Sequence, residues 1–345
     1  MLNGVTGLLR RKSRRKRLNL ALQGGGAHGA YAWGVLDYLL EDGRIDIAGV
    51  SGASAGAVNA VMLVDGLARG GPEEARKRLS DFWRAASIGG NLPGAQRAAL
   101  ERMLSLLPIG GAPFQFFLDT MSRVLSPYDI NPLNINPLKD LIGRFVDFEA
   151  VRASDLDLFV SATNVHTGRM RVFSRPEITA DVVMASAALP LLFQAVEIGG
   201  ESYWDGGFTG NPPILPLLET GAADDILFVQ ITPLFRKSVP TSARDIVQRM
   251  SEVAFGAAAS AELRTIEHFL RRGETGGKIN VHRIELHSPG RQLSAETRLK
   301  TDFDFLELLH RAGRRAARRF LDEHFDDIGV RGTAGPTSPT EARSA

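Results

Sequence analysis

The sequence predicts an α/β fold with a parallel sheet and helical crossovers. Two observations lead to this class. Short apolar runs of strand length alternate with longer segments of helical pattern, and small residues mark each passage from strand to helix. A strand at residues 18–23 precedes a helix ending near Asp42, and a strand at 47–50 precedes a helix ending near Ala68. This β-α-β-α order is typical of parallel strands joined through helices.

The rest of the chain continues in the same style. Further strands are expected at 156–163, 170–173, 196–198, 201–204, 226–231 and 279–286, and helices at 178–189, 242–272 and 301–325. We assign these elements to one domain over residues 18–330, with a C-terminal helical extension at 235–330 that includes one strand.

Three segments differ from the rest in composition, namely an insertion within this domain and the stretches before and after it. Residues 88–138 are rich in Gly, Pro and Asn around apolar helical pieces such as 114–125. They are expected to form an insertion, either a lid or binding segment or a structural excursion that covers the sheet. Residues 331–345 have the composition of a disordered tail.

Residues 1–17 are expected to form a flexible basic arm. Residues 10–17, RRKSRRKR, hold seven basic groups, and residues 1–17 hold no acidic one. The rest of the chain then has 34 basic against 39 acidic residues, so its net charge is about −5. The arm is either a solvated tail or a peripheral contact with an anionic membrane through residues 10–17. The negative body gives no support to nucleic acid as a partner.

Composition excludes several other classes. The chain has no cysteine, so disulfides, thiolate metal sites and a cysteine nucleophile are ruled out. No apolar run approaches the roughly 20 residues that span a bilayer. The apolar part of residues 18–23 ends at three glycines and is too short for the core of a signal peptide. We therefore expect a cytoplasmic protein without signal peptide or transmembrane segment, with peripheral membrane contact as an option.

A nucleophile motif follows the strand at 47–50. Residues 52–56, GASAG, fit G-x-S-x-G and lead into a small and apolar helical stretch at 55–64. A side chain held on a sharp strand-to-helix turn projects freely, and such a turn requires small neighbours. Ser54 is therefore a candidate nucleophile. The alternative is a turn of small residues packed for space.

A glycine cluster, GGGAHG at residues 24–29, follows the first strand. Gly24, Gly26 and Gly29 fit the dinucleotide fingerprint G-x-G-x-x-G, but Asp46 precedes the second strand instead of following it, so that interpretation fails. The same geometry presents bare backbone N–H groups to an oxyanion. The ends of the first two strands are expected to be neighbours, which would place both motifs at one ester carbonyl.

Asp205 is the candidate base for Ser54. The chain has seven histidines, and none lies in the small-residue loop context of a catalytic base: His28, His166, His268, His282, His287, His310 and His324. Asp205 ends a short strand and is followed by two glycines, which allow its backbone to approach another loop closely. The alternative is a turn-forming Asp-Gly pair without catalytic role.

Together these motifs resemble the patatin-like phospholipases, which are serine acyl hydrolases with a Ser–Asp dyad. GGGAHG, GASAG and DGG occur in this order, and the stretches at 185–190, 203–207 and 211–213 agree as well. The resemblance covers residues 18–232. It implies a mostly parallel sheet sandwiched by helices, related to the α/β-hydrolases but without their catalytic histidine.

The resemblance also implies the roles of individual residues. Ser54 would be the nucleophile and Asp205 the base that accepts its proton. The oxyanion hole would be lined by Gly24, Gly25 and Gly26 with the backbone N–H of Ala55. The motifs are completed by Gly29, Gly52, Gly56, Gly206 and Gly207.

One position departs from the family pattern. Members often carry Arg or Lys where this chain has His28. We expect His28 to order the loop and not to shuttle protons. Ser51 is assigned to the strand, since its neighbours do not form the elbow.

The sequence thus predicts a phospholipase A-type enzyme or esterase that cleaves lipid acyl esters through an acyl-enzyme on Ser54. No cofactor or metal is implied, because no HExxH or DxDxDG spacing occurs. The alternatives are hydrolysis of neutral lipids or polyesters, and an inactive membrane-associated binding protein. The oligomeric state is left open.

Overall fold

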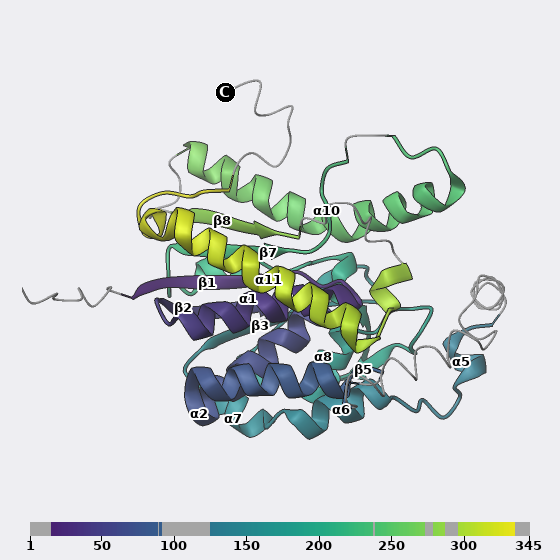
Figure 1. Cartoon of the computed structure of the whole chain (residues 1–345). Helices are drawn as coiled ribbons and strands as arrows, with labels where there is room; N and C mark the ends of the chain where they lie inside the picture. The colour runs from purple at the N-terminus through teal and green to yellow at the C-terminus, as the bar shows by residue number, and fades with distance from the viewer. Residues whose placement is uncertain are drawn as a thin grey trace, which may run out of the picture.

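The computed structural model describes residues 15–88, 90–91, 125–236, 239–272, 279–286 and 296–334 (Figure 1). Eight strands form one sheet, and helices lie on both of its faces. The predicted α/β class with a mostly parallel sheet is confirmed. Most of the basic arm, most of the predicted insertion and the last eleven residues lie outside the described residues.

The sheet has a parallel centre and an antiparallel margin. Its strand order is β5-β6-β3-β2-β1-β7-β8, with β4 paired to β3. The parallel strands are β1 (Lys16–Leu22), β2 (Ile45–Gly52), β3 (Asp157–Asn164), β7 (Asp225–Gln230) and β8 (Asn280–Glu285). The antiparallel strands are β4 (Met170–Ser174), β5 (Val196–Ile198) and β6 (Glu201–Asp205).

Helices connect and cover these strands. The α-helices are α1 (Gly29–Asp42), α2 (Ala55–Ala85), α5 (Pro127–Ile130), α6 (Pro137–Phe145), α7 (Phe148–Ala153), α8 (Ala180–Ser186), α9 (Leu215–Glu219), α10 (Ala243–Arg272) and α11 (Phe303–His324). The 3₁₀ turns are η1 (Gly26–His28), η3 (Arg175–Glu177), η4 (Gly206–Phe208), η5 (Glu296–Leu299) and η6 (Phe325–Asp327). Helix α2 is broken at Gly71, whose φ is 76° and which precedes Pro72.

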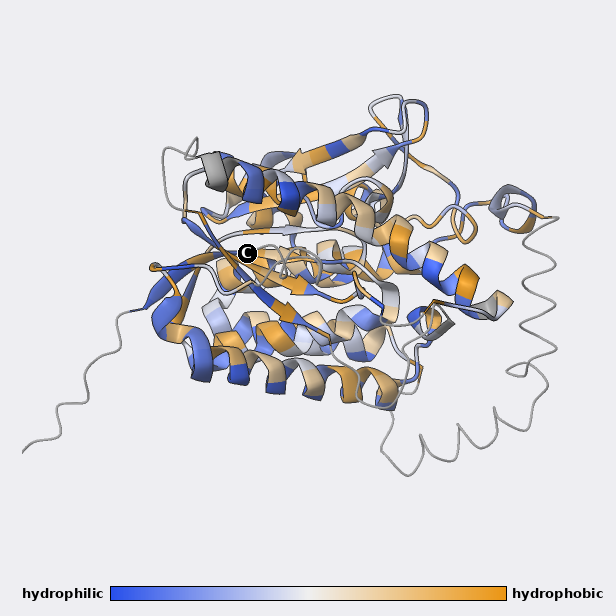
Figure 2. Cartoon of the chain, turned by 90° about the horizontal axis from the view of Figure 1, so that it is seen from above, coloured by the Kyte–Doolittle hydropathy of each residue, from blue (hydrophilic) through white to orange (hydrophobic). Residues whose placement is uncertain are grey.

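Alternating side chains of the central strand separate two cores. Leu18, Leu20 and Leu22 of β1 are buried in the larger core with α1, α2 and α11. Ala21 points to the other face, into a second core with α9 and α10. Burial on both faces explains why the strands are almost continuously apolar. Figure 2 shows these apolar strands inside helices whose residues alternate between apolar and polar.

Strand β6 brings a distant segment to the end of β2. Strand β4 pairs along one edge of β3, so β2 and β6 share the opposite edge. Gly52 at the end of β2 pairs with Val160, and Asp205 at the end of β6 pairs with Ala162, two residues farther along β3. The two strands therefore run toward one another along β3. Their ends meet at the carboxyl edge of the parallel strands.

The boundaries of the predicted arm and tail need correction. Strand β1 begins at Lys16, so Lys16 and Arg17 belong to the sheet and not to a free arm. The Lys16 ammonium donates a hydrogen bond to the Ile328 carbonyl at 2.6 Å. At the other end, the Thr333 and Ala334 N–H groups donate to the Val281 carbonyl at 2.9 Å. Residues 331–334 are thus held against β8, while 335–345 lie outside the described residues.

Three other segments also differ from expectation. The helix expected to end near Ala68 is longer, because α2 resumes after the break at Gly71 and ends at Ala85. The helix expected at 178–189 is shorter, because α8 ends at Ser186 and turns follow before Pro190. Within the predicted insertion at 88–138, residue 89 and residues 92–124, which hold most of the helical piece expected at 114–125, lie outside the described residues. Its described part contains α5 and the start of α6, and Ile88 forms a parallel bridge to Asp302.

Candidate active site

Ser54 occupies a strained turn between β2 and α2. Its φ and ψ are 53° and −126°, a combination that residues with a side chain rarely adopt. The Ser54 N–H donates to the Ser186 hydroxyl oxygen at 2.9 Å, which ties the turn to the end of α8. The glycines on either side allow close packing, since a Cβ on Gly56 would lie 2.0 Å from the Leu22 carbonyl oxygen. A Cβ on Gly52 would likewise lie 2.5 Å from Gly56.

The glycine loop after β1 touches this turn directly. A Cβ on Gly24 would lie 2.4 Å from the Ala53 carbonyl oxygen and 2.6 Å from the Ser54 Cβ, so only glycine fits there. The Gly24 N–H donates to the Asn211 Oδ1 at 2.7 Å. Gly24 therefore allows the glycine loop to pack closely against the Ser54 turn. Its N–H group is bonded to Asn211 and is not available to an oxyanion, although the sequence suggests that role.

Three backbone N–H groups remain available around the turn. In the described part of the chain, no acceptor binds the N–H groups of Gly25, Gly26 or Ala55. Ala55 is the first residue of α2, where N–H groups have no partner within the helix and the helix dipole favours negative charge. Gly29 packs against Ala55, since a Cβ there would lie 2.6 Å from the Ala55 Cβ. These donors can hold an oxyanion.

Asp205 lies at the end of β6, opposite Ala162 of β3. Ser54 follows the end of β2 by two residues, so the two residues lie at the same height along β3. Its side chain is fully buried. Its Oδ1 accepts from the Gly207 N–H at 2.7 Å. Oδ2 has no partner at full hydrogen-bond geometry among the described residues. Burial raises the pKa of Asp205 to about 7, against the opposing effects of the Gly207 N–H, the Ser54 hydroxyl and the Arg298 charge.

The two glycines after Asp205 are packed on both sides. A Cβ on Gly206 would lie 2.2 Å from the Ser161 carbonyl oxygen, and one on Gly207 would lie 2.4 Å from the Phe255 ring in α10. The Asn211 side chain also donates to the Phe255 carbonyl at 3.1 Å. Helix α10 thus supports the Asp205 loop and, through Asn211, the glycine loop.

His28 is a buried part of the glycine loop. Its Nε2 lies 2.8 Å from the Thr297 hydroxyl oxygen. Burial, assisted by the Arg298 charge, lowers the pKa of His28 to about 3, so the ring is neutral at physiological pH. These features suit a residue that orders the loop. Other described histidines contact carboxylates away from Ser54, namely His282 at Asp225, His310 at Asp37 and His324 at Asp327.

Arg298 is a charged neighbour of the site without a recognisable sequence motif. It lies in η5, and a Cβ on Gly26 would lie 2.4 Å from its carbonyl oxygen. Its charge acts on both Asp205 and His28. Neither Arg298 nor Thr297 could be selected from the sequence, because both follow an irregular stretch in the C-terminal third. Ser186 and Asn211 do lie in stretches that resemble the family, although their contacts are visible only in the structure.

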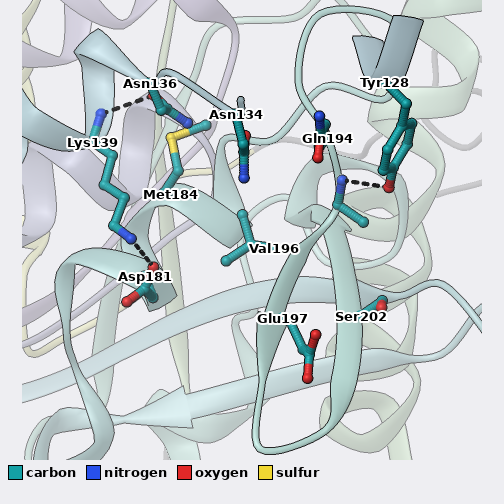
Figure 3. Close-up of a pocket in the computed structure, with 11 residues that line it drawn as sticks. Tyr128, Asn134, Asn136, Lys139, Asp181, Met184, Gln194, Val196, Glu197 and Ser202 are labelled. Atoms are coloured by element: carbon teal, nitrogen blue, oxygen red, sulfur yellow. Dashed lines mark hydrogen bonds and ion pairs between the residues drawn. The ribbon is translucent and has the colours of Figure 1, made fainter. Parts of the chain in front are cut away.

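A separate pocket of about 510 Å³ lies between the α5–α6 segment, α8 and the β5–β6 hairpin (Figure 3). Its lining is mostly polar and includes Lys139, which forms a 2.5 Å ion pair with Asp181. None of the predicted site residues lines it. Helix α8 links the two places, since Met184 lines the pocket and Ser186 holds the Ser54 turn.

Neither a candidate metal centre nor a candidate transmembrane helix is present within the described ranges. There, no group of three or more His, Asp or Glu side chains is placed to hold a metal ion. None of the helices in that part of the chain is both long and apolar enough to cross a bilayer.

Comparison with known proteins identifies one family. The model of the family described as Patatin-like phospholipase matches residues 20–218, which include the glycine loop, Ser54 and Asp205. No curated protein matches the chain.

Solved structures give only distant similarity. VipD from Legionella pneumophila is 16% identical, with a TM-score of 0.40 over 90% of this chain and 67% of VipD. The ExoU–SpcU complex from the type III secretion system of Pseudomonas aeruginosa gives 15% identity and a TM-score of 0.38 over 91% of this chain and 53% of the other. The type III effector protein ExoU gives 17% identity and a TM-score of 0.36, over 90% and 54%. The chain therefore spans about half the length of ExoU.

Proposed function

Because the chain belongs to the patatin-like phospholipase family, we propose that it hydrolyses lipid carboxylic esters through a Ser54 acyl-enzyme. Membership of this family indicates a lipid acyl hydrolase. The assignment of Ser54 as nucleophile, Asp205 as base and the glycine-loop N–H groups as oxyanion donors is our proposal. One observation carries it. A fully buried carboxyl, on whose pKa the Ser54 hydroxyl acts and whose Oδ2 is bonded by no other described group, stands beside a serine held in a strained strand-to-helix turn.

In the first half of the reaction, the Ser54 Oγ attacks the ester carbonyl carbon while its proton passes to Asp205 Oδ2. The carbonyl oxygen becomes an oxyanion and accepts hydrogen bonds from the N–H groups of Gly25, Gly26 and Ala55. Preorganised donors of this kind stabilise the tetrahedral intermediate strongly. When the intermediate collapses, the alcohol leaves with the proton from Asp205, and Ser54 keeps the acyl group.

In the second half, water attacks the acyl-enzyme and gives its proton to Asp205. The second tetrahedral intermediate uses the same donors. It collapses to release the carboxylic acid, and the proton on Asp205 returns to Ser54. Asp205 can serve both steps because a pKa of about 7 lets it take and release a proton near neutral pH.

Two alternatives lead to different results. In the first alternative the ester belongs to a neutral lipid or polyester in place of a phospholipid, which changes the substrate but not the dyad. An inactive binding protein of the same fold would leave Ser54 and Asp205 without a chemical role. The intact elbow, glycine loop and buried carboxyl argue against the second alternative. A strained turn and a buried carboxyl reduce stability, and an inactive protein would have no use for them.

Ser54→Ala and Asp205→Asn, with Ser51→Ala as the matched control, test the proposal. Activity is measured on a short-chain aryl ester and on a mixture of phospholipids and neutral lipids. Both site variants should lose about 10⁴-fold or more in kcat, and the double variant should be little worse than either, since residues of one catalytic unit are not additive. Ser51→Ala should keep its activity. Near wild-type turnover by Ser54→Ala would refute the proposed nucleophile.

A further inference from the structure

A segment outside the matched family region packs against the glycine loop. Turn η5 contacts it at two points. The Thr297 hydroxyl lies 2.8 Å from His28 Nε2, and the Arg298 carbonyl leaves no space for a Cβ on Gly26. These contacts place the Arg298 residue two positions along the loop from Gly24, which itself touches Ser54. The guanidinium lies over the Phe255 ring, which packs against Gly207 beside Asp205, and its charge acts on Asp205. Arg298 therefore lies near a ligand bound at Ser54.

The guanidinium of Arg298 makes only long hydrogen bonds among the described residues. Its Nη1 donates to the Ser251 hydroxyl and its Nη2 to the Thr232 hydroxyl, both at 3.3 Å. It also lies over the Phe255 ring at 5.5 Å. Within the described residues, no carboxylate forms an ion pair with it. A guanidinium carries five N–H donors in a fork that matches carboxylate and phosphate oxygens, so most of this capacity is left for a ligand.

Nearby carboxylates do not neutralise Arg298. Two act on its charge, Glu252 and Asp205. Glu252 is already bound by Arg236 at 2.6 and 2.9 Å and by Arg249 at 3.3 Å. Glu252 is thus shared with two other guanidinium groups, and neither Glu252 nor Asp205 forms an ion pair with Arg298 among the described residues. This excess positive charge beside the site favours an anionic ligand.

We infer that Arg298 binds the phosphate of a phospholipid whose acyl ester lies at Ser54. This inference rests on the proposed function and selects phospholipid over neutral lipid as its substrate. In a glycerophospholipid the phosphate is only a few bonds from the ester carbonyls. One molecule can therefore place a carbonyl at the glycine loop and its phosphate at Arg298. Arginine binds phosphate oxygens through two parallel hydrogen bonds, which lysine does not reproduce.

The kinetic test compares phosphatidylcholine with diacylglycerol of the same acyl chains, both in the same detergent micelles, and includes a soluble aryl ester. Arg298→Gln should lower kcat/KM for phosphatidylcholine by about 10- to 100-fold, since it removes charge-assisted hydrogen bonds. At pH 9, where Asp205 is ionised in both proteins, values for diacylglycerol and the aryl ester should change less than about threefold. Arg298→Lys should fall between wild type and Arg298→Gln on phosphatidylcholine.

The control is Arg311→Gln on α11, which removes an exposed positive charge paired only with Glu307 at 3.0 Å in the described structure. It should leave all three rates unchanged. Because the Arg298 charge lowers the pKa of Asp205, the aryl-ester profile of Arg298→Gln should shift to higher pH whatever Arg298 binds. Equal losses of Arg298→Gln on all three substrates at pH 9, where Asp205 is ionised, would show that Arg298 acts only through Asp205 or through folding. That result overturns the inference, as does an unchanged rate on phosphatidylcholine.

A binding test does not depend on turnover. Glycerol 3-phosphate should raise the Tm of the Ser54→Ala protein, while glycerol should not, and the additional change Arg298→Gln should remove the increase. Inorganic phosphate is the second probe. If it stabilises the protein through Arg298 as well as glycerol 3-phosphate does, and phosphatidylcholine kinetics are unaffected by Arg298→Gln, the site takes a free anion and the inference fails. If Ser54→Ala remained active, the proposed nucleophile would be wrong. The binding result for Arg298 would still hold, because it does not depend on turnover.

Discussion

The Ser54 N–H donates a hydrogen bond to the hydroxyl oxygen of Ser186 at 2.9 Å, across 132 positions of the chain. Both residues are buried. The bond satisfies a backbone donor at a residue whose φ is 53°. It holds the turn that aims the Ser54 side chain, and it connects this turn to α8.

Ser186→Ala should therefore impair both stability and catalysis. Leaving the buried Ser54 N–H without an acceptor costs about 1–3 kcal/mol of unfolding free energy. The looser turn should lower kcat on a soluble ester by about tenfold or more, because small displacements of a nucleophile are costly. Chemical denaturation and steady-state kinetics measure the two effects. An unchanged kcat would show that the turn is held without this bond.

Ser51→Ala is the matched control for both serine variants. Ser51 lies in β2 and is fully buried, and its hydroxyl has no hydrogen-bond partner in the described structure. Its removal should leave kcat unchanged and should not lower the free energy of unfolding, since no bond is lost. If Ser51→Ala lost as much activity as Ser54→Ala, the assignment of Ser54 as the nucleophile would be wrong.

The sequence allowed prediction of features that depend on local pattern. The elbow at residues 52–56 was predictable because a sharp turn packed against Leu22 requires glycine at position 56. The eight described strands follow apolar patterns and were predicted to within two residues at each end, and the bounds of α10 and α11 were predicted equally well. Helix α2 continues well past its predicted end, and α6, α7 and α9 were not predicted because they are short or lie in irregular stretches. The early start of β1 was missed because Lys16 and Arg17 continue a run of basic residues.

Features that depend on distant contacts were beyond sequence reasoning. That Asp205 meets Ser54 follows from the shared edge of β3, which no local pattern reveals, so only the family resemblance could assign it. The acceptor of the Gly24 N–H is Asn211, 187 positions away. Arg298 approaches the glycine loop by packing of a segment that carries no motif.

The activity should depend on the ionisation of Asp205. In the proposed mechanism the carboxylate is the active base, and burial raises its pKa to about 7. With a neutral soluble ester, kcat/KM should level off above pH 8 and fall about tenfold per pH unit well below pH 7. Measurement from pH 5 to 9, with Tm recorded at each pH, provides the test. A flat profile down to pH 5 in a folded enzyme would contradict Asp205 as the base.

The same carboxyl should reduce stability at high pH. Its pKa is higher in the folded state than the unfolded value of 3.8, so stability is lost as pH rises from about 4 through 7. Complete ionisation would cost about 4 kcal/mol of unfolding free energy. Asp205→Asn should thus be more stable than wild type at pH 8 and similar at pH 4. Equal differences at both pH values would contradict the raised pKa.

Asp225→Asn should change stability with the opposite dependence on pH. Asp225 accepts from His282 at 2.8 Å and from the Gly329 N–H at 2.8 Å, and these bonds hold its pKa below the ordinary value despite burial. Its stabilising effect is present above the unfolded pKa and is lost as pH falls. The variant should therefore lose more stability at pH 8 than at pH 3. Denaturation curves of both aspartate variants at the same pH values make the comparison.

Deleting residues 1–14 tests the basic arm as a membrane contact. The deletion removes Arg10, Arg11, Lys12 and Arg14 and leaves β1 intact. Each basic group near an anionic bilayer contributes about 1 kcal/mol, screened by salt. The shortened protein should bind anionic vesicles more weakly at low salt and hydrolyse them more slowly, with unchanged activity on a soluble ester. Equal sedimentation of both proteins with such vesicles would show that the arm is only a solvated tail.

Labelling with a fluorophosphonate tests the central claim, that Ser54 is a nucleophile activated by Asp205. Mass spectrometry of the labelled protein identifies the modified residue, and the labelling rate is measured for wild type, Ser51→Ala, Ser54→Ala and Asp205→Asn. The proposed dyad predicts one adduct on Ser54 in wild type and Ser51→Ala, none in Ser54→Ala, and much slower labelling in Asp205→Asn. An adduct on another residue, or labelling of Asp205→Asn at the wild-type rate, would contradict it.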